Sequence, residues 1–171
     1  DYDAVLRAFQ GCDAIVHMGA IPSPGHLPDH IVHNNNVVGS YNVLRAAAEL
    51  GITHICQASS VNATGAAYSR WPHYDYFPLD EQHPTYNEDP YSLSKWICEI
   101  QADSIARRFE HITIASMRFH WVVPDRGVAA SYNQRIGDAL GLFAQGGRAV
   151  VAEIPEPVLR PGEVLIAPAF S

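Results

Sequence analysis

The sequence predicts an α/β fold built around an incomplete doubly wound parallel sheet, followed by an atypical C-terminal tail. Two observations carry this prediction. Short apolar runs without polar alternation, typical of strands buried on both faces, occur three times along the chain. Between successive runs lies a longer segment whose apolar residues recur at helical spacing. Strands joined by long helices pair in parallel with right-handed crossovers, which builds an open sheet.

The first half of the predicted order is helix, strand, helix. Apolar side chains of the opening segment 1–9 share one helical face, and Gly11 ends that helix. We expect a strand within 12–20, followed by a loop rich in Pro, Gly and His. Apolar residues of 34–50 again fall at helical spacing, and Gly51 is typical of a helix C-terminus.

The second half of the predicted order is strand, helix, strand. A long polar and aromatic loop, 61–88, separates the second strand from the last helix. Asp89 and Pro90 are typical of an N-cap and a first helical residue, so we expect a helix over 91–109. The two strands are expected within 52–60 and 111–119.

The bulk composition limits the classes of partner. A length of 171 residues with 47% hydrophobic residues suits a folded domain rather than a disordered chain. The net charge of −7 argues against nucleic acid or an anionic membrane as a partner, and no apolar run is long enough to span a bilayer. The 3 cysteines form no CxxC pair, which predicts reduced, buried thiols in a cytoplasmic protein.

The stretch DPYSLSKWICE holds the only lysine of the sequence, Lys95, four residues after Tyr91. This spacing places both side chains on one face of a helix, with Cβ atoms about 5–6 Å apart. A phenol is a weak base at neutral pH, but a cation beside it favours the phenolate and lowers its pKa. The pair therefore predicts a tyrosine general base. The alternative is that Tyr91 only begins the helix and Lys95 is a solvated surface residue.

Ser60 lies where a ligand is expected, because ligands of doubly wound sheets bind at the carboxyl ends of the strands. Its hydroxyl could orient a substrate alcohol or carbonyl beside Tyr91. This combination suits removal of a proton from an alcohol while hydride leaves the same carbon. Otherwise Ser60 is an ordinary turn residue. The same sheet edge is expected to gather Gly19, Ala20, Ser59, Arg118, Phe119 and His120.

Five stretches carry a family resemblance: GCDAIVHMGA, NNNVVGSYNVLRAAAELGI, ICQASSVNATG, FPLDEQHPTYNEDPYSLSKWICE and IASMRF. In this order and spacing they resemble the extended short-chain dehydrogenases/reductases, the NAD-dependent sugar epimerase and dehydratase group, over residues 1–124. The resemblance implies a Rossmann-like fold and an enzyme that uses NAD or NADP to act on a sugar, sugar acid or sugar nucleotide. Uronate dehydrogenase-like members are the most similar in ASSVNATG and FPLDEQHPT.

The resemblance also implies roles for single residues. Tyr91 would be the general base, Lys95 its partner and ribose contact, and Ser60 the anchor of the substrate hydroxyl. Asn36, at the head of the N-V-x-G helix of the family, would complete the catalytic group. The cofactor contacts would be Gly19, Ala20, Ser59, Tyr91, Lys95, Arg118, Phe119 and His120.

A homodimer through helices 34–50 and 91–109 is a further implication of the resemblance. Trp96, Ile100 and Ile105 would supply apolar surface for it. The glycine-rich phosphate loop of the family has no counterpart in these 171 residues. We therefore expect this chain alone to bind NAD(P) weakly or not at all.

The chain divides by composition into a partial NAD(P)-binding domain, 1–145, and a tail, 146–171, that is rich in Pro and Val. The tail stretch EIPEPVLRPGEVLI resembles the opening strands of medium-chain, alcohol-dehydrogenase-like reductases. The alternative is a divergent substrate lobe of the short-chain family. For the whole chain, the rival to an enzyme is a non-catalytic module that serves as a partner surface.

Three histidines, His26, His30 and His33, have the spacing of one helical face and could in principle hold zinc. Pro28 within the stretch argues against a regular helix through it. We therefore expect solvated loop histidines and no metal site.

Overall fold

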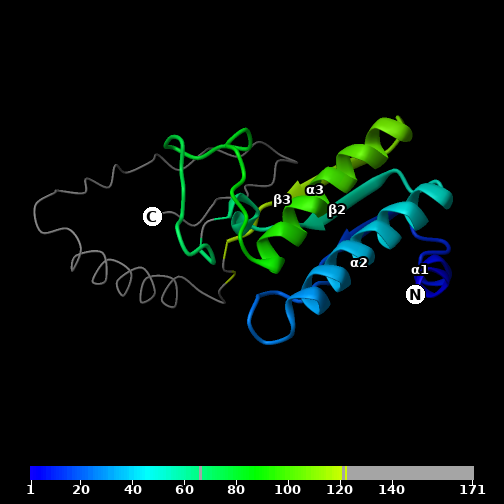
Figure 1. The fold of residues 1–171 in the computed structure, drawn as a ribbon. Coiled ribbons are helices and arrows are strands. Elements are labelled where there is room, and N and C mark those ends of the chain that lie inside the picture. The colour runs from blue at the N-terminus through cyan, green and yellow to red at the C-terminus, as the bar shows by residue number, and fades with distance from the viewer. Residues whose placement is uncertain (66, 121, 123–171) are drawn as a thin grey trace, which may run out of the picture. The chain divides into compact units, whose positions relative to one another are not determined.

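The computed structural model describes residues 1–65, 67–120 and 122 (Figure 1). These residues alternate helices and strands, as the sequence predicts. The elements in chain order are α1 (Tyr2–Ala8), β1 (Ala14–His17), α2 (Asp29–Glu49), β2 (His54–Ala58), the 3-10 turn η1 (Val61–Thr64), α3 (Pro90–Arg108) and β3 (Thr113–Met117). Residues Asp1–Phe119 form one compact unit. The predicted boundary between 145 and 146 and the tail lie outside the described residues.

The three strands form one parallel sheet in the order β1-β2-β3. Ile15 of β1 pairs with Ile55 of β2, which pairs with Ile114 of β3. Helices α2 and α3 lie side by side over one face of this sheet (Figure 1). The parallel pairing and the helical crossovers confirm the predicted α/β class.

The hydrophobic core lies between these two helices and the sheet. Leu44 and Ala47 of α2 are fully buried against Ile15 and Ile55. Ile105 of α3 joins the same cluster at 3% exposure. Complete burial of a leucine side chain contributes about 1.5–3 kcal/mol, so this cluster is the main source of stability for the unit. The expectation that Ile105 supplies free apolar surface is wrong, because its side chain faces the sheet.

Burial on the other face of the sheet differs from the expectation. Val16 of β1 is 72% exposed, because the side chains of successive strand residues point to opposite faces and α2 covers only one of them. The predicted burial of the three cysteines is likewise only partly right. All three thiols are free, but Cys98 is buried, Cys56 is half-buried and Cys12 is exposed. Cys12 is exposed because it precedes β1 instead of lying within it.

Helix α2 begins earlier than predicted, at Asp29 rather than residue 34. Pro28 occupies the N-cap position, where a missing backbone N–H has no consequence because it would have no helical partner. His30 and His33 therefore lie on the helix, and the expectation of loop histidines is wrong for these two. Among residues 1–65, 67–120 and 122, no cluster of His, Cys, Asp or Glu side chains has the arrangement of a metal site.

Helix α3 begins as predicted. The carboxylate of Asp89 accepts a hydrogen bond of 2.9 Å from the backbone N–H of Ser92, and Pro90 fills the first helical position. This cap fixes where the first turn of α3 stands, and Tyr91 lies in that turn.

No helix in the described part of the chain combines the length and apolar character needed to cross a membrane.

Candidate active site

Three side chains on α3 face the end of β2. Tyr91, Lys95 and Glu99 are spaced by four residues, so they form one stripe along the helix. Tyr91 and Lys95 are only 7% and 6% exposed. Lys95 Nζ donates a hydrogen bond of 2.7 Å to the carbonyl of Ala58, the last residue of β2. Lys95 is therefore held against the sheet edge, and the alternative of a solvated surface lysine is wrong.

The phenol of Tyr91 favours its neutral form in this chain. Burial raises the pKa of Tyr91 above its ordinary value, while a hydrogen bond with Ser60 acts in the opposite direction. The Lys95 ammonium lies 5.9 Å from the centroid of the Tyr91 ring. The expected lowering of this pKa is absent because desolvation of the phenolate outweighs the favourable contacts. The three side chains nevertheless meet, as the sequence predicts.

Burial also acts on the groups around Lys95. It lowers the pKa of the Lys95 ammonium, and it lowers the pKa of His17, which the positive charge of Lys95 lowers further. Burial raises the pKa of the Cys98 thiol, while Lys95 acts to lower it. His17 and Cys98 are thus within electrostatic reach of Lys95. The weakly solvated ammonium is suited to bind hydroxyl or carbonyl oxygens at this edge.

Ser60 is fixed by the turn that follows β2. It is the N-cap of η1, and its Oγ accepts a hydrogen bond of 3.1 Å from the backbone N–H of Asn62. The backbone N–H of Val61 donates a bond of 3.0 Å to the carbonyl of Phe119, beyond the end of β3. These two bonds hold the serine turn between β2 and β3. They explain why the Ser60 hydroxyl has a defined position next to Tyr91.

Asn36 connects two segments around this site by hydrogen bonds to Ile21 and Ser94. Its side chain accepts a bond of 2.8 Å from the N–H of Ile21 and donates one of 3.0 Å to the Ile21 carbonyl. Its amide also donates a bond of 3.0 Å to Ser94 Oγ, which donates one of 2.7 Å to the carbonyl of Tyr91. Asn36 thus ties the loop after β1 to the first turn of α3. A direct catalytic role for Asn36 stays a prediction.

Ser59 and Arg118 converge on Glu99, a residue that the sequence reasoning did not single out. Ser59 Oγ donates to Glu99 Oε1. The guanidinium of Arg118 donates two hydrogen bonds to the same carboxylate, of 3.0 and 2.9 Å, and lies 5.9 Å from the ring centroid of Trp96. A sequence signal was present, because Glu99 follows Lys95 by four residues. The roles of Ser59 and Arg118 as cofactor contacts stay predictions.

The remaining predicted contacts follow strands at the same sheet edge. Gly19, which is exposed, and Ala20, which is half-buried, come after β1, and Phe119 comes after β3. His120 lies outside the unit formed by Asp1–Phe119. Cofactor contacts from these four residues stay predictions.

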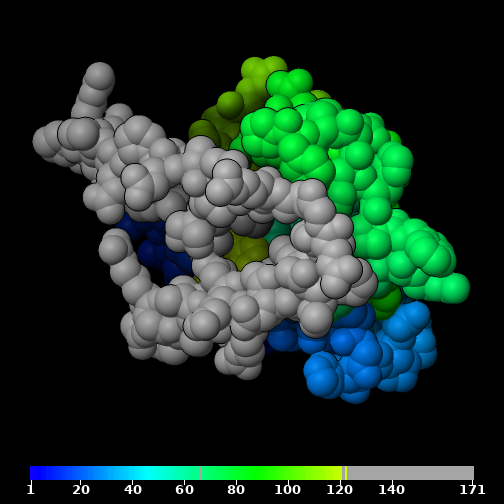
Figure 2. Space-filling view, turned by 90° about the vertical axis from the view of Figure 1, so that its left-hand side faces the viewer, coloured from blue at the N-terminus to red at the C-terminus, as the bar shows by residue number. Residues whose placement is uncertain are grey.

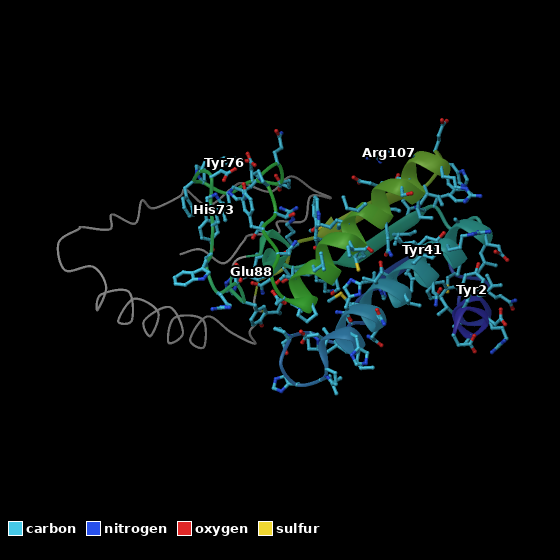
Figure 3. The ribbon with its side chains drawn as sticks, viewed as in Figure 1. Tyr2, Tyr41, His73, Tyr76, Glu88 and Arg107 are labelled. Atoms are coloured by element: carbon cyan, nitrogen blue, oxygen red, sulfur yellow. The ribbon has the colours of Figure 1, made fainter. Side chains whose placement is uncertain are left out.

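The loop between η1 and α3 is ordered by its own contacts. His83 is buried, and its Nδ1 donates a bond of 2.7 Å to the carbonyl of Pro84. Its Nε2 accepts a bond of 2.9 Å from the backbone N–H of Asp75. Tyr76, at the outer side of the loop, donates a bond of 2.6 Å to Asp80 (Figure 3). The loop is therefore a folded unit with a histidine at its centre.

This loop is attached beside the site. The N–H of Tyr86 donates a bond of 3.0 Å to the carbonyl of Thr64, and the intervening turn begins at Gly65 with φ +86°. The ring of Tyr68 stands edge-on to the Tyr91 ring, with centroids 6.0 Å apart. Figure 2 views the molecule from the end at which this loop (green) and the loop before α2 (blue) lie. Both loops border the carboxyl edge of the sheet that carries Ser60.

The comparison with protein families covers most of the chain. A family model described as NAD dependent epimerase/dehydratase family matches residues 1–155. The chain belongs to this epimerase/dehydratase family. The match includes the whole α3 stripe and the serine turn.

Two curated relatives carry the names of sugar enzymes. The chain is 40% identical over 60 residues to an L-arabinose 1-dehydrogenase (NAD(P)(+)) of Haloferax volcanii, covering 35% of this chain and 23% of that protein. It is 30% identical over 120 residues to a putative UDP-glucose 4-epimerase of Methanocaldococcus jannaschii, covering 69% and 37%. The chain therefore aligns with well under half the length of these epimerase/dehydratase relatives.

Solved structures agree on the fold. A mutated uronate dehydrogenase superposes with a TM-score of 0.57 at 28% identity, over 70% of this chain and 40% of the other. The described sheet and helices are thus similar in fold to part of that dehydrogenase.

Proposed function

We propose that this chain carries the proton-transfer group of an NAD(P)-dependent oxidoreductase or epimerase that acts on a sugar, sugar acid or sugar nucleotide. The observation that carries the proposal is a buried tyrosine flanked by the only lysine of the sequence and a capped serine, at the carboxyl edge of a parallel sheet. The names of the two relatives, an L-arabinose 1-dehydrogenase and a putative UDP-glucose 4-epimerase, support a sugar-type substrate. The family supports NAD or NADP as the cofactor.

The donor set at this edge fits the ribose end of such a cofactor. An ammonium group can donate three hydrogen bonds, and the bond from Lys95 to Ala58 uses one of them. Lys95 and Tyr91 would hold the ribose, and Gly19 and Ala20 would adjoin it at the end of β1. When bound, the oxidised cofactor supplies the hydride acceptor and a positive charge.

The side chains of this chain would carry the proton. The Ser60 hydroxyl orients the hydroxyl of the sugar toward Tyr91 Oη. Tyr91 then takes the hydroxyl proton as hydride leaves the carbon, and the carbonyl product forms. Because burial raises the pKa of Tyr91 in the chain alone, the phenolate needs added positive charge, which Lys95 and the cofactor provide together. A general base of this kind contributes about 10²–10⁴-fold to the rate.

The test is a comparison of two tyrosine variants of the full-length gene product, with NAD and NADP and a panel of sugars. Tyr91→Phe should lower kcat by about 10²–10⁴-fold, because it removes only the proton-accepting oxygen. Tyr2→Phe makes the same chemical change on α1, where the hydroxyl donates to Glu49, and should leave kcat unchanged. A Tyr91→Phe protein with near-normal turnover would refute the proposal and favour the non-catalytic module.

We also propose that the protein forms a homodimer through α2 and α3. Large apolar side chains are exposed on both helices: Ile31, Val38 and Tyr41 on α2, and Leu93 and Ile100 on α3. Exposed apolar groups gathered on two adjacent helices mark an interaction surface.

The free, exposed thiol of Cys12 favours a reducing compartment such as the cytoplasm.

A further inference from the structure

The α3 stripe contacts three consecutive residues at the exit of β2, Ala58–Ser60, and its third member, Glu99, also binds Arg118. Lys95 binds the Ala58 carbonyl, Glu99 accepts from the Ser59 hydroxyl, and Tyr91 adjoins Ser60. Each contact is made one helical turn from the next. A single helix therefore fixes the position of three successive residues at the exit of β2.

Glu99 is itself held from the other side. Its carboxylate accepts two hydrogen bonds from Arg118, and the two side chains are only 14% and 16% exposed. Two parallel N–H···O bonds fix both the position and the plane of a carboxylate. The pair therefore presents Glu99 Oε1 to Ser59 in a fixed geometry. Because this carboxylate also accepts the bond from Ser59, the half-buried pair can hold the Ser59 segment in place.

We infer that Glu99, braced by Arg118, is a positioning residue that sets the place of the Ser60 hydroxyl through its bond to Ser59. This inference rests on the proposed function for the meaning of the Ser60–Tyr91 contact. Ser59 directly precedes Ser60, whose backbone is extended, so a shift of one displaces the other. Loss of the Ser59–Glu99 bond should therefore loosen the Ser60 hydroxyl against Tyr91, while the fold and the α3 cap remain.

The experiment reads Tyr91 directly and needs no turnover. Tyrosine is labelled with ¹³C at Cζ, and the Tyr91 signal is assigned by its loss in Tyr91→Phe. Ser60→Ala gives the reference displacement for a lost hydroxyl contact. Ser59→Ala and Glu99→Gln should displace the Tyr91 signal in the same direction, and Ser59→Thr should restore the wild-type position.

A matched control separates positioning from a general effect of removing a carboxylate. Asp103 lies one turn further along α3 and forms an exposed pair with Arg107 at 3.5 Å. Asp103→Asn should leave the Tyr91 signal at the wild-type position. In the active protein, Ser59→Ala should lower kcat/KM by about 10-fold or more and move the acid limb of its pH profile to higher pH, and Asp103→Asn should do neither.

Glu99→Gln removes the carboxylate that pairs with the half-buried Arg118 and can unfold the chain, so Ser59→Ala, which keeps the ion pair, decides the outcome. An unmoved Tyr91 signal in folded Ser59→Ala overturns the inference. So does a Ser60→Ala protein that leaves the signal unmoved, because no Ser60–Tyr91 contact then exists. An unfolded Ser59→Ala chain assigns Ser59 to stability and overturns it as well. The proposed function fails separately, through an active Tyr91→Phe protein.

Discussion

Replacement of Gly65 by alanine should detach the loop from the site. Gly65 has φ +86°, in the left-handed region, where an alanine side chain costs about 1–2 kcal/mol. An added Cβ would also lie 2.4 Å from the backbone oxygen of Tyr86, where ordinary contacts begin near 3.4 Å. The Tyr86 backbone must then retreat by about 1 Å, which breaks its 3.0 Å bond to Thr64. The sum is about 2–3 kcal/mol.

Gly51→Ala is the matched control, because it separates backbone strain from the collision. Gly51 has φ +71° and no atom within 4 Å of the added Cβ. It closes α2, where the fold fixes its conformation, so the substitution should cost only the strain of about 1–2 kcal/mol.

The assay is limited proteolysis of the 67–88 loop, together with urea unfolding followed by circular dichroism. Cleavage in the loop of Gly65→Ala should be at least about tenfold faster than in the wild type, since each 1.4 kcal/mol changes an opening equilibrium tenfold. Gly51→Ala should lower global stability without faster loop cleavage. If Gly65→Ala resists protease as well as Gly51→Ala does, the contact between Gly65 and Tyr86 does not hold the loop.

Three further outcomes are expected. Burial raises the pKa of Tyr91 in the folded chain, so the neutral phenol stabilises the fold fully below the ordinary pKa of about 10 and this contribution is lost as the pH rises above it. In urea titrations above pH 10, Tyr91→Phe should therefore lose less unfolding free energy than the wild type. His83→Phe removes two hydrogen bonds inside the loop and should speed loop cleavage in the same proteolysis assay, while an unchanged rate would show that the loop is ordered without them. Ile100→Glu places a charge on the exposed face of α3 and should convert a dimer into a monomer in sedimentation at micromolar concentration, whereas a wild type that is already monomeric contradicts the dimer.

Local sequence signals determine much of the fold. The Asp89–Pro90 pair predicted the start of α3 because a capping carboxylate and a proline act within one turn of the chain. The meeting of Ser60 with Tyr91 followed from the rule that parallel strands share a carboxyl edge. The start of α2 was missed because Pro28 was judged as a helix interior residue, whereas it stands just outside the helix.

The electrostatic details depend on contacts between distant segments, which spacing does not reveal. The sequence indicated that Lys95 would lower the pKa of Tyr91, but the balance is set by how deeply α3 buries the phenol. The ion pair of Glu99 with Arg118 joins residues of α3 and the β3 exit, and only the sheet geometry brings them together. Ile105 was assigned to the surface because an apolar residue on a helix does not reveal which of two faces the sheet covers.

The loop that folds around His83 is joined to the rest of the unit through few bonds near its ends, one of them between Tyr86 and Thr64. The catalytic candidates, by contrast, all stand on α3 or at the exit of β2. Because the loop and the catalytic candidates lie on separate parts of the chain, their sequences can diverge at different rates in evolution. Insertions and exchanges within 67–82 can reshape what borders Tyr91 without moving the helix, whereas one residue inserted between Tyr91 and Glu99 turns part of the stripe by about 100° away from the strand. Under the proposed function, exchange of the loop would change the surroundings of Tyr91 on a helical frame that tolerates almost no change in length.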